Sequence, residues 1–195
     1  TPVLVLSDLE LGMNENLSEP LQWDDSRRYD RGKVLSAEQL DGVENYGRYL
    51  DVDGDGVGYR TLPGTHPDKG AFFTRGTSRD EYAAYTESPV DYERNMQRLL
   101  LKWETAKTLM PKPEIQLNGS SAGIVYYGTT ALPVPEAMDH LRASNIVVDS
   151  ARIRAFPFGE EITEFMASHD LIFVIEQNRD AQMKTLLVNE LQIDP

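Results

Sequence analysis

The sequence has 195 residues, of which 40% are hydrophobic and 26% charged, a composition typical of a globular protein with one substantial core. Its net charge of −13 opposes the clustered cations that neutralise nucleic-acid phosphates, so we expect no nucleic-acid partner. No apolar run approaches the ~20 residues that span a bilayer, and we expect no membrane contact and a cytoplasmic location. With no cysteine, the chain offers no disulfide, thiolate nucleophile or iron–sulfur ligand.

The chain begins with an apolar run, residues 3–6, that predicts a strand buried on both faces of a parallel sheet. Because no strand precedes it and the chain lacks a starting Met, we interpret it as the last strand of an upstream domain. Residues 12–31 are polar and irregular, with Pro20 and Trp23, and indicate an inter-domain connection. We therefore assign residues 1–31 to the end of one domain and a linker.

Residues 48–79 are rich in glycine and proline, which predicts a hairpin followed by shaped loops. Pro89 then begins a helix that we expect to end near Pro111, because proline suits the first helical position. Its apolar stripe, which includes Tyr92, Met96 and Trp103, is interpreted as core packing. Residues 32–112 should thus form a Gly-rich loop region and an amphipathic helix.

After Pro113 the pattern alternates between strands and helices as a βαβαβα unit, which we assign to residues 113–195. Connections of this length are right-handed crossovers between parallel strands. The predicted fold class is therefore α/β, an open and mainly parallel sheet with helices on both faces. The expected strands are residues 122–127, 146–149 and 171–176, and the expected helices are residues 134–142, 159–167 and 181–191.

An acidic segment, residues 51–56, matches the opening of a calcium loop, with oxygen ligands at alternate positions and Gly56 sixth. The match fails at the ninth position, Tyr59, and at the twelfth, Leu62, where an EF-hand needs a bidentate Glu. We predict no metal site and interpret the segment as an acidic turn, with a weaker divalent site as the alternative.

The next stretch, residues 57–79, reverses the sign of the chain, because it sets several cations against the single acid Asp68. Arginine donates two parallel hydrogen bonds to a carboxylate or phosphate, and glycine lets the backbone approach a ligand closely. The stretch suggests an anion site, and pairing of these cations with surface acids is an equal alternative. The candidate substrate-binding residues are Arg60, His66, Lys69, Arg75 and Arg79.

Polar side chains also follow two of the expected parallel strands, at the sheet edge where ligands or partners bind in such folds. After the first strand, backbone amides and hydroxyls could hold an anion, and after the third, a dense polar group could contact a ligand or a subunit. Ordinary helix capping explains both groups too. The candidates for anion or partner contacts are Gly128, Thr129, Thr130, Glu176, Asn178 and Arg179. His140 and His169 lack a neighbouring nucleophile and are interpreted as structural or solvated.

Seven loop motifs follow one another along nearly the whole chain: residues 7–14 (SDLELGMN), 23–26 (WDDS), 59–61 (YRT), 63–67 (PGTHP), 75–82 (RGTSRDEY), 127–130 (YGTT) and 176–183 (EQNRDAQM). Together they resemble the alpha subunit of 2-oxoacid:ferredoxin oxidoreductases, in its 2-oxoglutarate-type branch. The resemblance implies a thiamine diphosphate enzyme that converts 2-oxoglutarate and coenzyme A to succinyl-CoA and CO2 while reducing ferredoxin. It also implies that residues 113–195 resemble the transketolase C-terminal domain.

The resemblance places thiamine diphosphate, Mg²⁺ and the iron–sulfur cluster in the full complex, with the diphosphate, metal and cluster on the beta subunit. The pyrimidine-binding domain of the alpha subunit would lie before residue 1, so we assign no catalytic residue here and expect no cofactor on this chain alone. The expected partners are the beta subunit, ferredoxin, coenzyme A and the 2-oxoacid, and the isolated chain should be inactive. The alternatives are a subunit specific for pyruvate or another 2-oxoacid, and a non-enzymatic module that binds an acidic ligand or a divalent ion.

Overall fold

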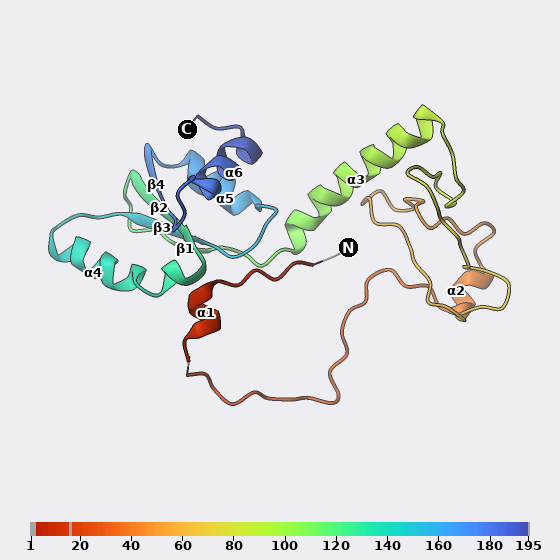
Figure 1. The fold of residues 1–195 in the computed structure, drawn as a ribbon, viewed down its shortest axis with the longest axis horizontal. Coiled ribbons are helices and arrows are strands. Elements are labelled where there is room, and N and C mark those ends of the chain that lie inside the picture. The colour runs from red at the N-terminus through yellow and green to blue at the C-terminus, as the bar shows by residue number, and fades with distance from the viewer. Residues whose placement is uncertain (1–2, 16, 195) are drawn as a thin grey trace. The chain divides into compact units, whose positions relative to one another are not determined.

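The structure, a computed structural model, describes residues 3–15 and 17–194 (Figure 1). The chain forms two compact units, one of Thr1–Leu21 with Leu109–Pro195 and one of Gln22–Thr108. The first unit contains the sheet and most of the helices, which are α1 (Leu9–Met13), β1 (Glu114–Gln116), β2 (Ala122–Tyr127), the 3₁₀ turn η1 (Gly128–Ala131), α4 (Val134–Ala143), β3 (Asp149–Ile153), α5 (Glu160–Ala167), β4 (Leu171–Ile175) and α6 (Gln182–Leu191).

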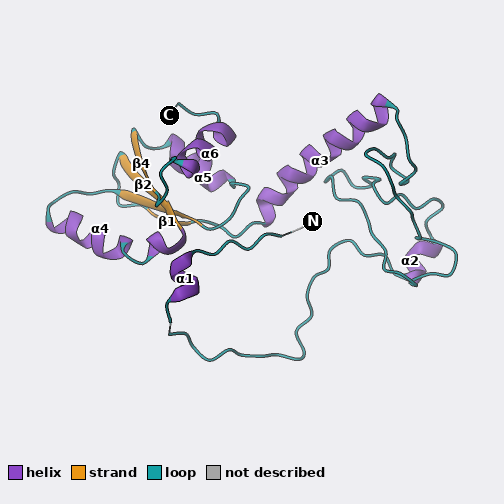
Figure 2. Ribbon diagram, viewed as in Figure 1, coloured by secondary structure: helices purple, strands orange, loops and turns teal. Residues whose placement is uncertain are grey.

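The four strands, drawn in orange in Figure 2, form one open sheet, and their order is β1-β3-β2-β4. Strand β2 is central and pairs in parallel with β3 on one side and β4 on the other, whereas the short edge strand β1 runs antiparallel to β3. Glu114 lies opposite Arg152 across that edge, and their side chains form an ion pair of 3.0 Å. The predicted fold class, an open and mainly parallel α/β sheet, is confirmed.

Helices cover both faces of the sheet because alternate residues of each parallel strand point to opposite sides. On one face Val125 and Ala151 pack with Phe165 of α5 and Leu187 of α6 in the larger core. On the other face α4 packs its Val134 and Met138 against residues that include Val148 and Ile124. The sheet is thus held between two helical layers, and its carboxyl edge stays open to the loops that follow β2 and β4.

Gly123 on β2 shows how tightly the larger core is packed. A Cβ atom at this position would lie 2.9 Å from Cζ of Phe165 and 3.0 Å from Cδ1 of Ile172. Interiors packed at crystal-like density have no free space for such an atom, so only glycine lets α5 approach the centre of the sheet.

The strand expected at residues 146–149 lies further along the chain, as β3. The cause is the end of α4, where Asn145 takes a left-handed φ of 59° and the amide of Ile146 donates to the carbonyl of Leu141 at 2.9 Å. This pairing is typical of a helix C-terminus, so Ile146 and Val147 complete the turn and stay half-exposed. The ladder with β2 begins at Asp149, opposite Gly123.

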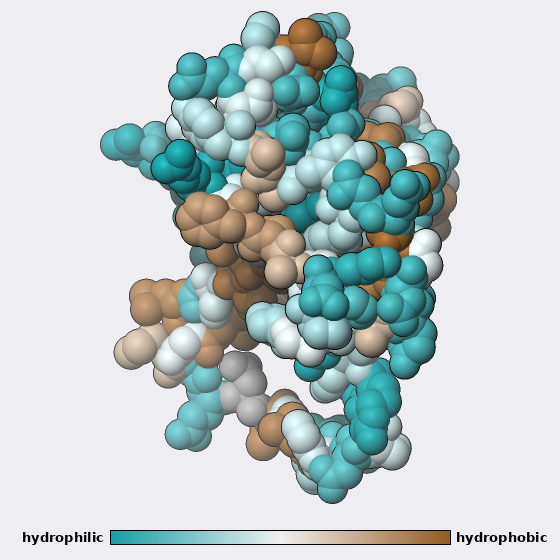
Figure 3. All heavy atoms as spheres, turned by 90° about the vertical axis from the view of Figure 1, so that its right-hand side faces the viewer, coloured by the Kyte–Doolittle hydropathy of each residue, from teal (hydrophilic) through white to brown (hydrophobic). Residues whose placement is uncertain are grey.

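The apolar run at residues 3–6 forms no strand in the described chain, which corrects the expectation of a buried orphan strand. Its side chains are 82–91% exposed, because no described strand pairs with it. Apolar atoms reach the surface at several other places as well (Figure 3).

The second unit has two helices, α2 (Ala37–Asp41) and α3 (Pro89–Leu109), and is otherwise irregular. The helix predicted from Pro89 is confirmed as α3, but its apolar stripe is not buried, with Tyr92 53% and Trp103 42% exposed. The hairpin expected within residues 48–79 is absent from the described residues. Instead of a ladder, this region has two isolated bridges, which pair Val34 with Arg60 and Arg79 with Tyr85. The left-handed glycines of this stretch turn the chain too often for a strand to extend.

No helix among the described residues combines the length and apolar character needed to cross a membrane.

Candidate functional site

The carboxyl ends of β2 and β4 lie side by side, since the two strands are parallel neighbours with Tyr126 opposite Ile175. The residues that follow them meet there. Asn178 donates to the hydroxyl of Tyr127 at 3.4 Å and to the carboxylate of Glu176 at 2.5 Å. This edge is where parallel α/β folds usually bind ligands.

Glu176 uses its carboxylate to hold the start of α6. One oxygen accepts from the amide of Met183 at 2.9 Å and the other from the amide of Lys184 at 3.2 Å. Burial acts to raise the pKa of Glu176, but the Met183 amide, Asn178 and the Lys184 amide together hold that pKa below its usual range. The charge therefore stays in place at neutral pH and caps the helix dipole.

Arg179 behaves differently from its neighbours in the same loop. Its guanidinium is 90% exposed and forms a two-pronged ion pair with the adjacent Asp180, at 2.7 and 3.1 Å. The structure brings Glu176 and Asn178 together with Tyr127 and turns Arg179 outward.

Gly128, Thr129 and Thr130 form the turn η1 after β2, and a carboxylate of the same chain lies against it. The amide of Thr129 donates to Oδ2 of Asp8 at 3.2 Å, while Oδ1 of Asp8 accepts from the amide of Leu11. Hydrogen bonds from Leu11 and then Thr129 lower the pKa of Asp8. The turn thus binds one carboxylate oxygen, as a left-handed Gly128 with φ 58° allows.

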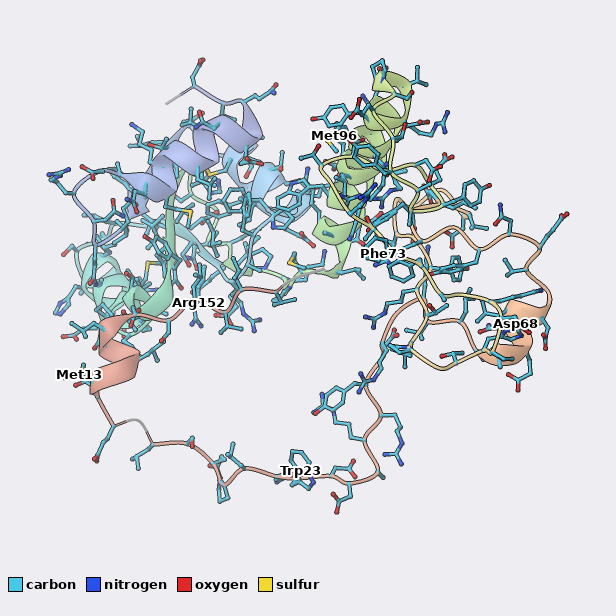
Figure 4. All side chains as sticks on the ribbon, turned by 45° about the vertical axis from the view of Figure 1, so that its right-hand side comes forward. Met13, Trp23, Asp68, Phe73, Met96 and Arg152 are labelled. Carbon is cyan, nitrogen blue, oxygen red and sulfur yellow. The ribbon has the colours of Figure 1, made fainter. Side chains whose placement is uncertain are left out.

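Two of the cationic candidates, His66 and Lys69, hold the end of helix α2 (Figure 4 labels their neighbour Asp68). The Lys69 ammonium donates to the carbonyls of Leu40, Asp41 and Val43 at 3.0–3.2 Å, which are groups that a helix end leaves without partners. Nδ1 of His66 accepts from the amides of Asp68 and Lys69, so its Nε2 carries the proton and donates to Asp41 at 3.1 Å.

The other three candidates are separate from this pair. Arg60 donates to the carbonyl of Arg31 at 2.7 Å and is exposed. Arg75 is exposed, and its guanidinium lies 5.8 Å from the ring centre of Tyr85. Arg79 is half-buried, donates to the carbonyl of Gly76 at 2.8 Å and lies 5.6 Å from the ring centre of Tyr49. The five candidates do not converge on one point.

The acidic segment 51–56 brings together carboxylates of Asp51, Asp53 and Asp55, with ligand atoms within 4.8 Å of one another. The ammonium of Lys33 lies at this place, 2.5 Å from Asp53 and 2.6 Å from Asp55. One internal cation therefore pairs with two of the three acids that a divalent ion would use, and the absence of a metal site here stays a prediction.

Sequence reasoning missed a group of cations in the second unit. Arg48 and Arg98 lie with Arg79 near the ring of Tyr49, and Lys102 lies near Arg98. Guanidinium carbons of Arg48 and Arg98 are 5.4 and 5.7 Å from the ring centre of Tyr49. Arg98 and Lys102 are four residues apart on α3 and so share one face, a spacing that the sequence does show. Their meeting with Arg48 and Arg79 depends on contacts across some 50 residues of irregular chain, which no local pattern encodes.

No family model matches the sequence. Over 171 residues, which are 85% of this chain, it is 30% identical to subunit alpha of 2-oxoacid:ferredoxin oxidoreductase 2 from Aeropyrum pernix. The chain spans about a quarter of that relative's length, 25%. The structure superimposes on 2-oxoglutarate:ferredoxin oxidoreductase from Magnetococcus marinus, solved with 2-oxoglutarate, coenzyme A and succinyl-CoA bound. That match has a TM-score of 0.69 and 25% identity, and it covers 80% of this chain and 27% of the other. The resemblance of this chain to the alpha subunits of 2-oxoacid:ferredoxin oxidoreductases is thereby confirmed.

Proposed function

We propose that this chain is part of a thiamine diphosphate-dependent 2-oxoglutarate:ferredoxin oxidoreductase. In that complex 2-oxoglutarate and coenzyme A would give succinyl-CoA and CO2, and electrons would pass to ferredoxin. The observation that carries the proposal is the agreement of the two likenesses, in sequence over 85% of the chain and in fold over 80%. The 2-oxoglutarate preference rests on the Magnetococcus structure, whose bound molecules are 2-oxoglutarate, coenzyme A and succinyl-CoA. A cytoplasmic location is part of the same proposal.

The residues of this chain do not fit the cofactors of such a complex. Without cysteine it cannot ligate an ordinary iron–sulfur cluster. Among the described residues, the carboxylates of Asp51, Asp53 and Asp55 are the one group with magnesium-type ligands, and Lys33 already forms ion pairs with two of them. We therefore propose that thiamine diphosphate, Mg²⁺ and the cluster belong to the rest of the complex, the beta subunit above all.

If so, the isolated chain has no turnover of its own. The purified 195-residue chain should show no reduction of a viologen dye with 2-oxoglutarate, coenzyme A, thiamine diphosphate and Mg²⁺. The same mixture with the complete complex is the positive control. Turnover by the chain alone would contradict the assignment of the cofactors to its partners.

For substrate choice, we propose that cations of residues 57–79 contact the second carboxylate of 2-oxoglutarate, which pyruvate lacks. Arg60 and Arg75 support this best, because both are exposed and neither is ion-paired to a described carboxylate. Lys69 and His66 contribute indirectly, by holding the end of α2.

The test is the ratio of kcat/KM for 2-oxoglutarate and pyruvate in the complete complex. Arg60→Gln or Arg75→Gln should raise KM for 2-oxoglutarate about tenfold or more, the worth of one charge-assisted hydrogen bond, and leave pyruvate kinetics unchanged. Arg142→Gln, on the exposed face of α4 where Arg142 pairs with Asp139, is a control with the same change of charge. An unchanged ratio in both variants would remove these arginines from substrate recognition, and a native preference for pyruvate would overturn the proposed substrate.

A further inference from the structure

Three arginines gather in the second unit around the ring of Tyr49, and Lys102 lies near two of them, Arg98 and Arg48. Arg48 and Arg79 come from the irregular chain, and Arg98 and Lys102 from successive turns of α3. The three guanidinium carbons lie 5.4, 5.6 and 5.7 Å from the ring centre. All four side chains are at least partly buried. This concentration of positive charge stands in a chain whose net charge is −13.

The described part of the chain supplies no carboxylate within ion-pair distance of any of these four cations. Glu81, a carboxylate of this region, forms its salt bridge with Arg94 instead, at 2.9 Å. Asp51 is close enough to act on Arg98, but its oxygens already accept from the amides of Gly54 and Gly56 at 3.0 Å. Cation–π contacts with the Tyr49 ring are too weak to balance desolvated charges of one sign.

Two of the guanidinium groups also leave a buried donor unused. Nε of Arg79 and Nε of Arg98 are both buried and lack a hydrogen-bond partner. Each has one terminal nitrogen satisfied by a carbonyl, of Gly76 and Gly56 respectively. Buried polar atoms without partners are rare because each one destabilises the fold. Two in one group of cations therefore indicate that a hydrogen-bond acceptor belongs there.

The electrostatics agree with the geometry. Burial lowers the pKa of Lys102, and the neighbouring Arg98 and Arg48 lower it further. Burial and Arg48 likewise lower the pKa of Arg98. Lys102 and Arg98 are therefore in an environment that disfavours their charge, which a bound anion would reverse. A cavity of about 250 Å³ opens beside Arg98, and its lining also includes Tyr49, Arg94 and the carboxylates of Asp51 and Glu81.

We propose that Arg48, Arg79, Arg98 and Lys102 form a binding site for a diphosphate-bearing anion. A diphosphate spreads several negative charges over many acceptor oxygens, which matches three guanidinium forks and an ammonium. A single carboxylate has one charge and two oxygens, and it would leave most of the group unbalanced. The site does not depend on the proposed function, because all its parts lie in this chain.

Calorimetry with inorganic pyrophosphate tests the site on the 195-residue chain at low chloride. We expect saturable one-to-one binding that weakens about tenfold or more in Arg98→Gln, the worth of one charge-assisted hydrogen bond. Arg142→Gln, which removes an equal charge in the first unit, should bind as the unchanged chain does. In NMR spectra the Nε–H signals of Arg79 and Arg98 should move on binding. Equal losses in Arg98→Gln and Arg142→Gln, or no saturable binding, would overturn the proposal.

The variant Lys102→Met distinguishes loss of the binding site from loss of the folded structure. It removes a desolvated charge for which the structure records no hydrogen bond, so the melting temperature of the free chain should stay the same or rise, while the increase caused by pyrophosphate shrinks. A fall in the melting temperature with full pyrophosphate stabilisation would contradict the site.

Two further ligands identify the anion. ADP that binds as tightly as pyrophosphate would point to a nucleotide as the source of the diphosphate, and pyrophosphate alone to a free one, and either result supports the site. Glutarate that binds as tightly as pyrophosphate would overturn the diphosphate assignment in favour of a dicarboxylate.

Discussion

At the open edge of the sheet, the carboxylate of Glu176 links the end of β4 to the start of α6. Its net hydrogen bonding lowers its pKa from the ordinary value of 4.5, so folding favours the charged form. A depressed carboxyl pKa contributes stability above the unfolded value and loses it as pH falls through the folded value. The stabilisation is therefore fully present at neutral pH and disappears in acid.

Glu176→Gln should lower the free energy of unfolding by about 1 kcal/mol at pH 7, as the loss of a helix cap does. The difference from the unchanged chain should shrink as pH falls from 4.5 through the lower pKa of folded Glu176, because below that value both chains are uncharged at this position. Urea unfolding between pH 3 and 7 measures it. Glu190→Gln, at the exposed end of the same helix, should have little effect at any pH, and a loss as large as that of Glu176→Gln would contradict the capping role.

Asp149 and His169 form a buried pair at the opposite end of the sheet, with side chains 5% and 2% exposed. Nε2 of His169 faces Oδ2 of Asp149 at 3.2 Å and Nδ1 faces the carbonyl of Phe165 at 2.7 Å. Nδ1 also lies 3.1 Å from the Ser168 hydroxyl, which can donate to it, so Nε2 can carry the proton and donate to Asp149. The histidine is structural, in agreement with the sequence interpretation.

Asp149→Leu should cost about 3 kcal/mol or more, because it leaves Nε2 of His169 and the amides of Asn118 and Ser120 buried without the acceptor that Asp149 supplies. Asp149→Asn should cost much less. Its oxygen can keep both amides, and its NH2 group can donate to Nε2 of a neutral His169. Denaturant unfolding of the two variants compares them, and equal losses would mean that volume alone matters at this position.

At the scale of the elements, the close approach of α5 to β2 depends on Gly123. Gly123→Ala places a methyl group 2.9 Å from the Phe165 ring and should cost about 1–3 kcal/mol through overpacking. Phe165→Leu in the same chain should recover part of that loss, since the smaller side chain makes room. Gly12→Ala, which meets nothing within 4 Å, is the matched control. Strictly additive losses in the double variant would show that the two side chains do not contact each other.

The sequence predicts elements well where an apolar pattern is itself the cause of burial. Strand β2 occupies the residues expected of it, and α3 begins at the predicted Pro89. Strand β1 is missed because its three residues are all exposed and carry no alternation. The run at residues 3–6 fails for the opposite reason, since apolar character alone cannot supply a pairing partner.

In the candidate site too, some residues can be predicted from the sequence and others cannot. Glu176 and Asn178 are predictable, because any residue that follows a parallel strand lies at the carboxyl edge of the sheet. Asp8 is not, since its hydrogen bond to Thr129 joins positions 121 residues apart. Lys69 shows a third case: the cation is visible in the sequence, but its role at the end of α2 depends on carbonyls some 28 residues earlier.

At the scale of the whole chain, few hydrogen bonds hold residues 12–31, the segment between the two units. Trp23 is 83% exposed, and its indole donates within the segment, to Asp25 (Figure 4 labels Trp23). Residues 17–31 are all exposed, and the backbone hydrogen bond from Arg27 to Asp24 closes only a local turn. Residues 12–31 are therefore proposed to act as a linker between separately folded units, as their composition indicates.

Trypsin should cut this linker first, after Arg27, Arg28 or Arg31, because proteases need several residues of unpaired backbone in an extended form. Arg142 and Lys184 are also exposed targets for trypsin, but α4 and α6 hold their backbones in helices, so they should be cut at least tenfold more slowly. Mass spectrometry of the first fragments under native conditions measures the order. Early cleavage within residues 109–195 would show that the sheet unit, rather than the linker, is the weakest part of the chain.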